Sequence, residues 1–453
     1  MQDFWTPLQK IIADVCLNFD KTWQVRKRVI TTQFLVLVIF KLVLSKNRQG
    51  YKSLLTEIWE SPEISAFQNT PVAASSLCEA RQKMPEEIFL ELNRAVLAAR
   101  EAAVPLPLWC GLRVFGVDGS KLNLPHELLS EGYRAPNVGQ YYPQGLLSTV
   151  YHLGSGLIYD CMLADGGKGE RSCVIEQMDK LSKGDVLVLD RGYFSYLLLD
   201  KALEKGVHLI CRLQSGNMNA AVKTFWDSEL TDVVVDYKPS GAVKSEIKKQ
   251  GHTLFYSTIR LRLIKYKIDG ETYICATTLI GEQYPSEEFP RVYHGRWGIE
   301  ELYKISKEFI DVEDFHSKTE RGVKQELYGH ALLINIGRIF ESEANRQMPP
   351  SSKPEKPEKQ KAENAEIKEG YWQDFIGKIQ QLKVNFKNCL LVIGRVIEKL
   401  LVTAEKEKDW LSQILSSISR VRQKLRPGRH FPRQSRKPYT KWQNINAAKL
   451  AKA

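Results

Sequence analysis

The sequence lacks the features of exported, disulfide-stabilised or membrane-spanning chains. Its eight cysteines are scattered and none forms a Cys-x-x-Cys pair, which disfavours a zinc site and a disulfide framework. The longest apolar run, 34–44, is interrupted by Lys41 and is too short to cross a bilayer. No cationic segment followed by an apolar one with a cleavage site opens the chain. We therefore expect a cytoplasmic protein in a reducing compartment, with no membrane partner.

Positive charge is abundant but unevenly distributed. The 453 residues carry a net charge of +12, and nine Lys or Arg without any Asp or Glu fall between Arg420 and Lys441. This tail also contains Phe431, Tyr439 and Trp442, and basic residues interleaved with aromatics suit a nucleic-acid backbone. DNA is therefore the favoured partner, with a disordered basic extension as the alternative.

Hydrophobic periodicity predicts an α/β protein whose centre is flanked by helical regions. Apolar residues recur at helical spacing before Pro105, and short apolar runs with helices between them follow from Gly111. Strand patterns dominate the insertion, where no helix is predicted. The predicted regions are a helical N-terminal domain (1–108), an α/β core (109–345) with a β-rich insertion (about 214–290), a Pro/Lys/Glu-rich mobile loop (346–370) and a helical C-terminal region with the basic tail (371–453).

Four side chains near position 300 follow a helical spacing. Tyr293, Arg296, Glu300 and Lys307 are separated by three, four and seven residues, so at about 100° per residue they share a stripe about 60° wide. An exposed ion-pair face is one interpretation. Because a purely solvated helix would scatter such groups, we favour a helix that holds a metal ion and binds phosphates. Two glycines near its start weaken the first turn.

Two aspartates follow apolar runs further upstream. Asp118 comes after 114–117 and Asp190 after 186–189, at strand ends where open α/β sheets bind ligands. Phosphodiester cleavage by two metal ions needs carboxylates that hold hard divalent cations about 3.5–4 Å apart.

Glu300 would supply a third carboxylate to this pair. Its neighbour Glu301 lies about 100° further round the helix, off the stripe. Taken singly, each acid has an ordinary alternative: a hairpin turn at Asp118-Gly, or a solvated glutamate on a helix. Together they indicate a metal site.

The segment 293–307 resembles the Y-x2-R-x3-E-x6-K signature of bacterial insertion-sequence DDE transposases, the cut-and-paste group. The Asp118-Gly-Ser and Asp190-Arg-Gly-Tyr segments resemble the two aspartate motifs of that family, in the same order. The resemblance implies a ribonuclease H-like catalytic core in which Asp118, Asp190 and Glu300 form the metal-binding triad. It also implies a β-rich insertion between the second aspartate and the glutamate.

The resemblance further implies contacts with DNA. In the family, the Tyr, Arg and Lys of the signature contact the terminal phosphates of transposon DNA, so Tyr293, Arg296 and Lys307 inherit that role. Arginine suits it because its guanidinium binds phosphate oxygens in a fork. Arg191, beside the second aspartate, and Arg212, after the next strand, are further candidates near the metals. Surface or salt-bridged arginines are the alternative.

Two more candidates for DNA contact lie outside these motifs. In family relatives an aromatic of the insertion can stack on an extruded base, and Trp226 is a candidate counterpart, with a core position as the alternative. The segment 71–83 is predicted to form a short capped helix with Arg81 available. It resembles the family's N-terminal DNA-binding segment, although an ordinary packed helix explains it too.

The predicted function is a DNA transposase that uses Mg²⁺, with Mn²⁺ as a substitute. It would cleave transposon ends and join the 3′-hydroxyl to target DNA by two-metal phosphoryl transfer. Expected partners are the terminal inverted repeats, target DNA and a second copy in a homodimer on DNA, at the bacterial nucleoid. The alternatives are a ribonuclease H-like structure-selective nuclease or resolvase, which does not need the Tyr-Arg-Lys stripe, and a catalytically silent DNA-binding repressor derived from a transposase.

Overall fold

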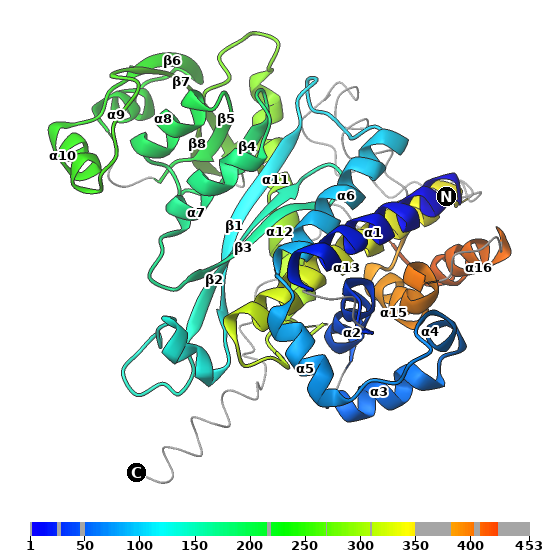
Figure 1. Cartoon of the computed structure of the whole chain (residues 1–453). Helices are drawn as coiled ribbons and strands as arrows, with labels where there is room; N and C mark the ends of the chain where they lie inside the picture. Colours follow the sequence, from blue (N-terminus) through cyan, green and yellow to red (C-terminus); the bar gives the residue numbers. More distant parts are fainter. Residues whose placement is uncertain are drawn as a thin grey trace.

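A computed structural model describes most of the chain. The described residues are 2–24, 29–45, 50–214, 219–268, 270–308, 310–348, 382–402 and 408–424. The predicted mobile loop from residue 349 onward and the basic tail after Lys424 lie outside them. A long mixed sheet runs through the molecule, with a bundle of helices gathered beside one of its ends (Figure 1).

The sheet has eight strands in the order β3-β2-β1-β4-β5-β8-β7-β6. β1 pairs antiparallel with β2 and parallel with β4, which is itself parallel to β5. Two antiparallel hairpin partners followed by parallel strands are the ribonuclease H-like arrangement, so the predicted fold class is confirmed. The strands are β1 (Val114–Asn123), β2 (Gln144–His152), β3 (Ile158–Asp165), β4 (Val186–Leu189), β5 (His208–Arg212), β6 (Asp232–Tyr237), β7 (Ile259–Ile268) and β8 (Glu271–Thr277).

The central strands are apolar because both of their faces are covered. On β4, Leu187 and Leu189 join one buried cluster, whereas Val186 and Val188 join another on the opposite face. Successive side chains of a strand point to opposite faces, so a run of four apolar residues serves two cores. This is why 186–189 is predicted and observed with the same bounds.

The helices outside the insertion come from distant parts of the chain. They are α1 (Gln2–Trp23), α2 (Thr32–Leu44), α3 (Tyr51–Glu60), α4 (Pro62–Phe67), α5 (Ala74–Lys83), α6 (Glu87–Ala103), α7 (Glu170–Gln177), α8 (Tyr196–Glu204), α11 (Phe289–Gly295), α12 (Trp297–Glu308), α13 (Glu320–Gln347), α15 (Phe386–Val402) and α16 (Lys408–Ser419), with short 3-10 turns η1 (His126–Glu131), η2 (Met178–Lys180) and η3 (Ser286–Glu288). None of these described helices is long and apolar enough to span a membrane.

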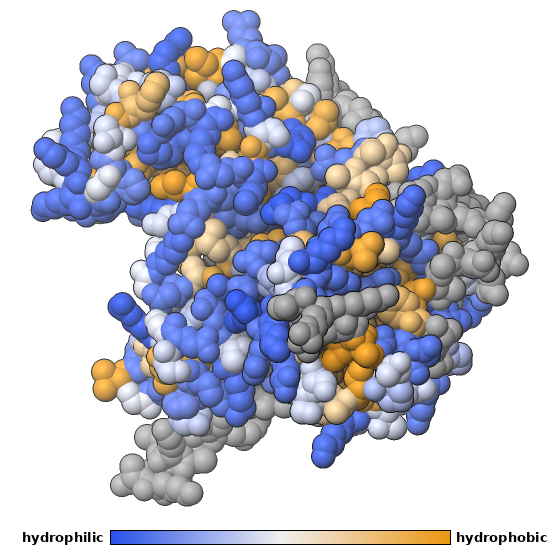
Figure 2. All heavy atoms as spheres, in the orientation of Figure 1, coloured by the Kyte–Doolittle hydropathy of each residue, from blue (hydrophilic) through white to orange (hydrophobic). Residues whose placement is uncertain are grey.

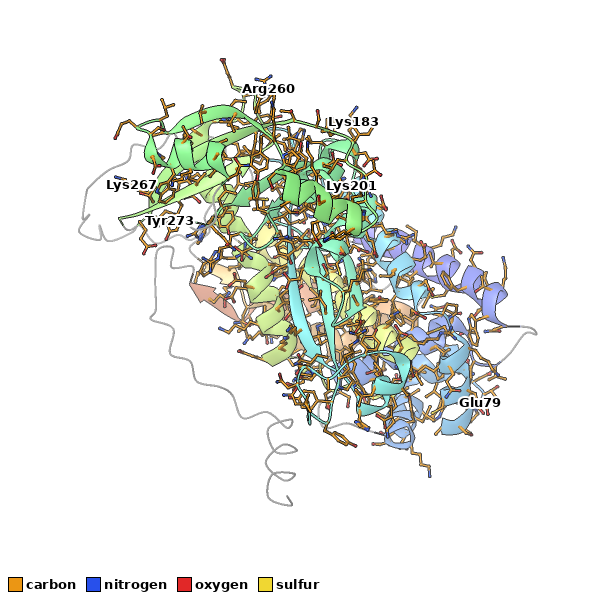
Figure 3. The ribbon with its side chains drawn as sticks, turned by 90° about the vertical axis from the view of Figure 1, so that its left-hand side faces the viewer. Glu79, Lys183, Lys201, Arg260, Lys267 and Tyr273 are labelled. Carbon is orange, nitrogen blue, oxygen red and sulfur yellow. The ribbon has the colours of Figure 1, made fainter. Side chains whose placement is uncertain are left out.

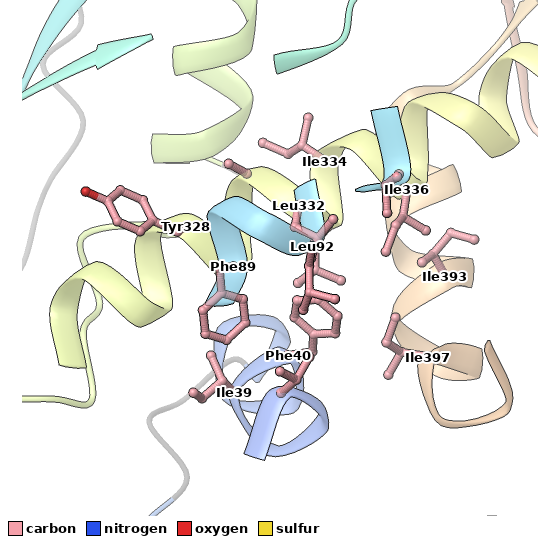
Figure 4. Close-up of a cluster of buried hydrophobic side chains, with 14 of the residues drawn as sticks. Ile39, Phe40, Phe89, Leu92, Tyr328, Leu332, Ile334, Ile336, Ile393 and Ile397 are labelled. Carbon is pink, nitrogen blue, oxygen red and sulfur yellow. The ribbon is translucent and has the colours of Figure 1, made fainter. Parts of the chain in front are cut away.

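The long helix α13 organises the helical part. Figure 4 shows Phe40 of α2, Phe89 of α6, Leu332 of α13 and Ile393 of α15 converging in one apolar cluster. All four are fully or almost fully buried. The N-terminal and C-terminal helices therefore share a single hydrophobic core around α13, although more than 300 residues of sequence separate α2 from α15.

The insertion differs from its prediction in containing helices. Its strands β6, β7 and β8 extend the central sheet, but α9 (Ala220–Asp227) and α10 (Gly241–Lys249) lie between them. The expectation of no helix between about 214 and 290 was wrong. Each helix is only two turns long and buries very few side chains, such as Ile247 of α10, which leaves too little periodicity to detect.

The C-terminal region also contains strands that the helical pattern did not predict. β9 (Leu382–Val384) and β10 (Arg422–Lys424) form a separate two-stranded sheet. Strands of three residues are too short for an alternating pattern to be recognised.

Hydrophilic side chains dominate the face shown in Figure 2, which is hollowed between the part that holds α9 and α10 and the body below it.

Candidate active site

Asp118 and Asp190 lie level with each other on neighbouring parallel strands. The parallel register pairs Phe115 with Leu187 and Gly116 with Val188, and its continuation brings the two aspartates side by side. Asp190 directly follows β4, as predicted. β1, however, does not end at Asp118 but continues to Asn123 as the partner of β2. The hairpin-turn alternative for Asp118 is thereby excluded.

Both aspartates are on the face of the sheet that α11 covers. Side chains alternate along a strand, so Asp118 shares a face with Val114, and Asp190 shares one with Val188. These two valines pack in the same cluster as Tyr293 of α11. The strand pattern therefore directs both carboxylates towards the helix that carries the signature.

The predicted stripe is divided between two helices. α11 ends at Gly295 and α12 begins at Trp297, so Arg296 stands at their junction with a backbone that is still helical (φ −55°, ψ −28°). A glycine in α12 also has a packing reason, since a Cβ at Gly298 would lie 3.1 Å from Cε1 of Tyr151 on β2. The glycines that weaken the helix thus allow it to approach the sheet closely.

Hydrogen bonds and ion pairs connect the signature to the acids. The hydroxyl of Tyr293 donates to Oδ1 of Asp190 at 3.0 Å. Nη2 of Arg296 donates to Oε1 of Glu300 at 2.9 Å, and Nη1 lies 3.6 Å from Oδ2 of Asp118. The fold therefore brings five of the predicted residues into one site. Glu300 is half-buried in it, whereas the adjacent Glu301 is exposed on the other side of α12.

Burial raises the pKa of Asp118 to about 6. The Arg296 guanidinium and the Gly119 N–H, which donates to Oδ1 at 3.0 Å, act in the opposite direction. The carboxylates of Glu170 and Glu300 raise the pKa further, because like charges disfavour ionisation. A site with several acids and one arginine has an excess of negative charge that suits cations.

The oxygen ligands of the site suit a hard divalent cation, but they do not converge. Asp118, Asp190 and Glu300 offer only carboxylate oxygens, the ligands that Mg²⁺ and Ca²⁺ prefer. No group of three His, Cys, Asp or Glu within the described ranges is arranged to hold a metal ion. Arg296 lies between Asp118 and Glu300, with Nη1 3.6 Å from Asp118 and Nη2 2.9 Å from Glu300. The donor chemistry fits a metal, and the arginine occupies the space between the donors.

Lys307 is placed apart from the acids. Its Nζ donates to the backbone oxygen of Lys121 on β1 at 2.6 Å, and burial lowers its pKa. It lies two turns along α12 from Glu300, close to the extension of β1 beyond Asp118. Lys307 therefore supplies a positive charge near β1 and pairs with none of the three acids in the structure described.

The other DNA-contact candidates have different surroundings. Arg191 is exposed and lines an open cavity of about 910 Å³ beside α7, α8 and α10. Arg212 stacks on Tyr273, with its guanidinium carbon 3.5 Å from the ring centre, and Tyr273 is labelled in Figure 3. Trp226 lies on α9, half-buried against the cluster that includes Phe225, which favours the core alternative.

Arg81 is not available for DNA in this structure. Its residue is 3% exposed, and its guanidinium donates to side chains of Tyr51, Gln325 and Glu326 and to the backbone oxygen of Gly322. The helix 74–83 exists, but its N-cap residue makes no side-chain hydrogen bond, so the predicted cap is absent. The prediction of a DNA-facing Arg81 was wrong, because burial against α13 cannot be seen from local sequence.

Two residues near the site were missed. The hydroxyl of Tyr303 donates to the backbone oxygen of Asp118 at 2.7 Å and anchors α12 to β1. Its position three residues after Glu300, on the same side of the helix, was the available signal. Glu170 begins α7, and its Oε1 would lie 2.9 Å from a Cβ at Gly119. Only the tertiary structure brings it beside the acids.

Comparison with known proteins agrees with this geometry. Residues 109–336 match the family described as the transposase DDE domain. The transposase InsG for insertion sequence element IS4 of Escherichia coli (strain K12) is 24% identical over 333 residues, which cover 71% of this chain and 72% of that protein. The transposase for insertion sequence element IS231F of Bacillus thuringiensis subsp. israelensis is 23% identical over 273 residues, 49% of this chain and 55% of that protein.

A cryo-EM structure of piggyBac transposase in a synaptic complex with hairpin DNA aligns with 95% of this chain and 86% of its own, at 11% identity and a TM-score of 0.42. The family match covers the whole segment that contains both aspartates, the insertion and the signature helix. On that match, the chain belongs to the DDE transposase family.

Proposed function

We propose that this transposase cleaves the ends of its element and joins them to target DNA at the site formed by Asp118, Asp190 and Glu300. The observation that carries the proposal is the level placement of Asp118 on β1 and Asp190 directly after β4, with Arg296 connecting Asp118 to Glu300 of α12. Acids brought together from three elements, on one side of a sheet, are what metal-dependent phosphoryl transfer requires.

These three carboxylates would hold the divalent metal ions that the family uses, and Mg²⁺, with Mn²⁺ as a substitute, is the proposed metal. When bound, such ions activate water and stabilise the leaving oxygen. Tyr303 donates to the backbone oxygen of Asp118 and so holds α12, which carries Glu300, against β1. Tyr293 donates to Asp190 and thereby orients that carboxylate.

Contacts with the DNA backbone are proposed for the cations around the acids. Lys307 supplies a point charge near β1, and Arg191 an exposed guanidinium beside the second aspartate. Basic side chains elsewhere on the insertion, among them Arg260 and Lys267, point outward (Figure 3). These charges would position terminal and target DNA without reading its sequence.

The organisation of the chain remains part of the proposal. The helical region 1–108 is proposed to bind the transposon end, through surfaces other than the buried Arg81. The core is proposed to span 109–345, with the insertion at about 214–290. Because two ends must be held together for cut-and-paste transposition, a homodimer on DNA is proposed, at the bacterial nucleoid.

Cleavage of a linear DNA that carries the flanking ends, in the presence of Mg²⁺, tests the proposal. Asp118→Ala, Asp190→Ala and Glu300→Ala should each abolish cleavage and strand joining. Glu301→Ala is the matched control, since it removes an exposed carboxylate from the next position of the same helix. If Glu300→Ala cuts as well as the unaltered protein, or if only Glu301→Ala is inactive, the assignment of the third acid fails.

A further inference from the structure

Arg296 is buried between two of the acids rather than presented to solvent. The residue is 5% exposed, with Nη2 at 2.9 Å from Glu300 and Nη1 at 3.6 Å from Asp118. Its Nε is also buried and has no hydrogen-bond partner among the described residues. The guanidinium thus partly neutralises the carboxylates while one of its own donors remains unused.

The fold makes room for the arginine at this position. A Cβ on Gly116 would lie 2.9 Å from a methyl carbon of Leu153, which is too close, and 3.6 Å from Cγ of Arg296, so the strand leaves space beside the arginine side chain. The ring of Tyr293 lies 5.8 Å from its guanidinium carbon. The Arg296 side chain therefore packs between Gly116 of β1 and the ring of Tyr293 of α11, and its guanidinium reaches Asp118 and Glu300.

This location conflicts with both tasks of the site. Arg296 cannot bind a DNA phosphate while it is buried against the sheet. Asp118 and Glu300 would hold metal ions less well while the guanidinium lies between them, because the arginine and a metal cation would compete for the same carboxylate oxygens. Both tasks require the same movement, which is withdrawal of Arg296 from the acids.

We propose that Arg296 is an internal counter-ion of the DNA-free protein, and that the DNA end draws it onto a phosphate and so releases the carboxylates for metal ions. The inference rests on the proposed function of the triad. A phosphate offers the guanidinium a bidentate acceptor and allows the unused Nε to donate. The side chain of Glu300 is 37% exposed, so the pair opens towards solvent.

Because the DNA end releases the carboxylates that would hold metal ions, the binding of DNA and the binding of metal are thermodynamically coupled. If DNA raises the affinity for metal, metal must raise the affinity for DNA by the same factor. The negative acids remain paired until the correct substrate is present, so free metal is held weakly and hydrolysis of unrelated DNA is limited. Arg296 is in this sense a positioning residue for the metal ligands.

Mn²⁺ binding, measured from the electron paramagnetic resonance of free Mn²⁺, tests the inference without any reaction. The unaltered protein should bind Mn²⁺ roughly tenfold more tightly with a duplex of the element's end than alone, after subtraction of Mn²⁺ bound by the duplex itself. Arg296→Gln should bind Mn²⁺ roughly tenfold more tightly than the unaltered protein when DNA is absent, and the end duplex should add little further.

Arg291→Gln is the matched control, because it makes the same substitution at an arginine of α11, one that is paired with Glu288 instead of an acid of the site. It should leave DNA-free Mn²⁺ affinity unchanged. Loss of Mn²⁺ binding in Glu300→Ala together with no gain in folded Arg296→Gln would overturn the counter-ion role and leave the triad standing. Mn²⁺ binding that is unchanged in Glu300→Ala would instead contradict the proposed function.

Thermal unfolding and circular dichroism show whether Arg296→Gln is folded. If the variant is not folded, the Mn²⁺ affinity of the unaltered protein with and without the end duplex still tests the inference. Equal Mn²⁺ affinity in the two states contradicts the inference, because release of the acids by DNA must increase that affinity.

Discussion

Two buried arginines of this transposase are used in opposite ways. Arg81 holds α5 to α13 and has an acceptor for each of its nitrogens, including Oε1 of Glu326 at 2.5 Å. Arg296 faces Asp118 and Glu300 with longer contacts and an unused Nε. An arginine whose donors are all hydrogen-bonded stabilises a single arrangement of its neighbours. An arginine that keeps one donor without an acceptor, beside partly exposed acids, can exchange those acids for another acceptor at a lower cost.

The surroundings of the two sites differ accordingly. Glu326 also accepts from the backbone N–H groups of His316 and Ser317, so its charge is fully compensated inside the helical core. The acids around Arg296 retain excess negative charge, and burial raises the pKa of Asp118. Excess charge lowers stability in the absence of a ligand and favours cation binding when one arrives.

The largest effect on stability should come from breaking the Arg81 cluster. Glu326→Ala leaves the Arg81 guanidinium buried without its counter-charge, which should lower the free energy of unfolding by about 3–5 kcal/mol. Urea denaturation measures this change. Glu79→Ala replaces an exposed residue of α5, the helix that carries Arg81, and should change the free energy of unfolding by less than about 0.5 kcal/mol; Glu79 is labelled in Figure 3. Similar decreases in the free energy of unfolding for both variants would contradict a structural role of the Arg81 cluster.

Asp118→Asn should stabilise the metal-free protein at high pH. Because the pKa of Asp118 rises from 3.8 to about 6 on folding, the stability it contributes is present below pH 3.8 and is lost as the pH rises through 6. The variant cannot ionise, so at pH 8 its free energy of unfolding should exceed that of the unaltered protein by about 3 kcal/mol. Unfolding in EDTA from pH 4 to 8 measures the difference, and a difference independent of pH would contradict the shift.

Tyr293→Phe should have a smaller effect. It removes the hydrogen bond to Asp190, which is half-buried and remains accessible to water, so the expected loss is about 1 kcal/mol. A double-mutant cycle with Asp190→Asn isolates the pair, and the coupling energy should account for most of that loss. A coupling near zero would mean that the tyrosine acts through packing alone.

The smallest change in stability is expected for Lys307→Gln. Its contact with the backbone oxygen of Lys121 is solvent-exposed, so the free energy of unfolding should change by less than about 0.5 kcal/mol. DNA binding should nevertheless weaken, and the slope of log affinity against log salt should fall by about 1, the value for one lost phosphate contact. Fluorescence anisotropy over a salt series measures it. An unchanged slope would remove Lys307 from the DNA interface.

Local patterns of sequence were sufficient for several elements. The strand 186–189 has the predicted bounds, because a run of apolar residues that serves two cores can be recognised from neighbouring residues alone. The helices α9 and α10 were not predicted because each has too few buried apolar residues to produce a helical repeat in the sequence. Trp226 was consequently expected among strands and lies on a helix.

The ribonuclease H-like class was implied by the resemblance of the motifs to a known family. By itself the sequence determined the order of the acidic motifs and placed Arg296 and Glu300 on one stripe of a helical segment, with Glu301 about 100° further round. Spacing along one element is a local property, so these features need no knowledge of partners. Only the tertiary structure decided that Arg81 is buried and that Arg296 lies across the acids. Both outcomes depend on segments more than 100 residues apart in the chain, whose packing no local pattern records.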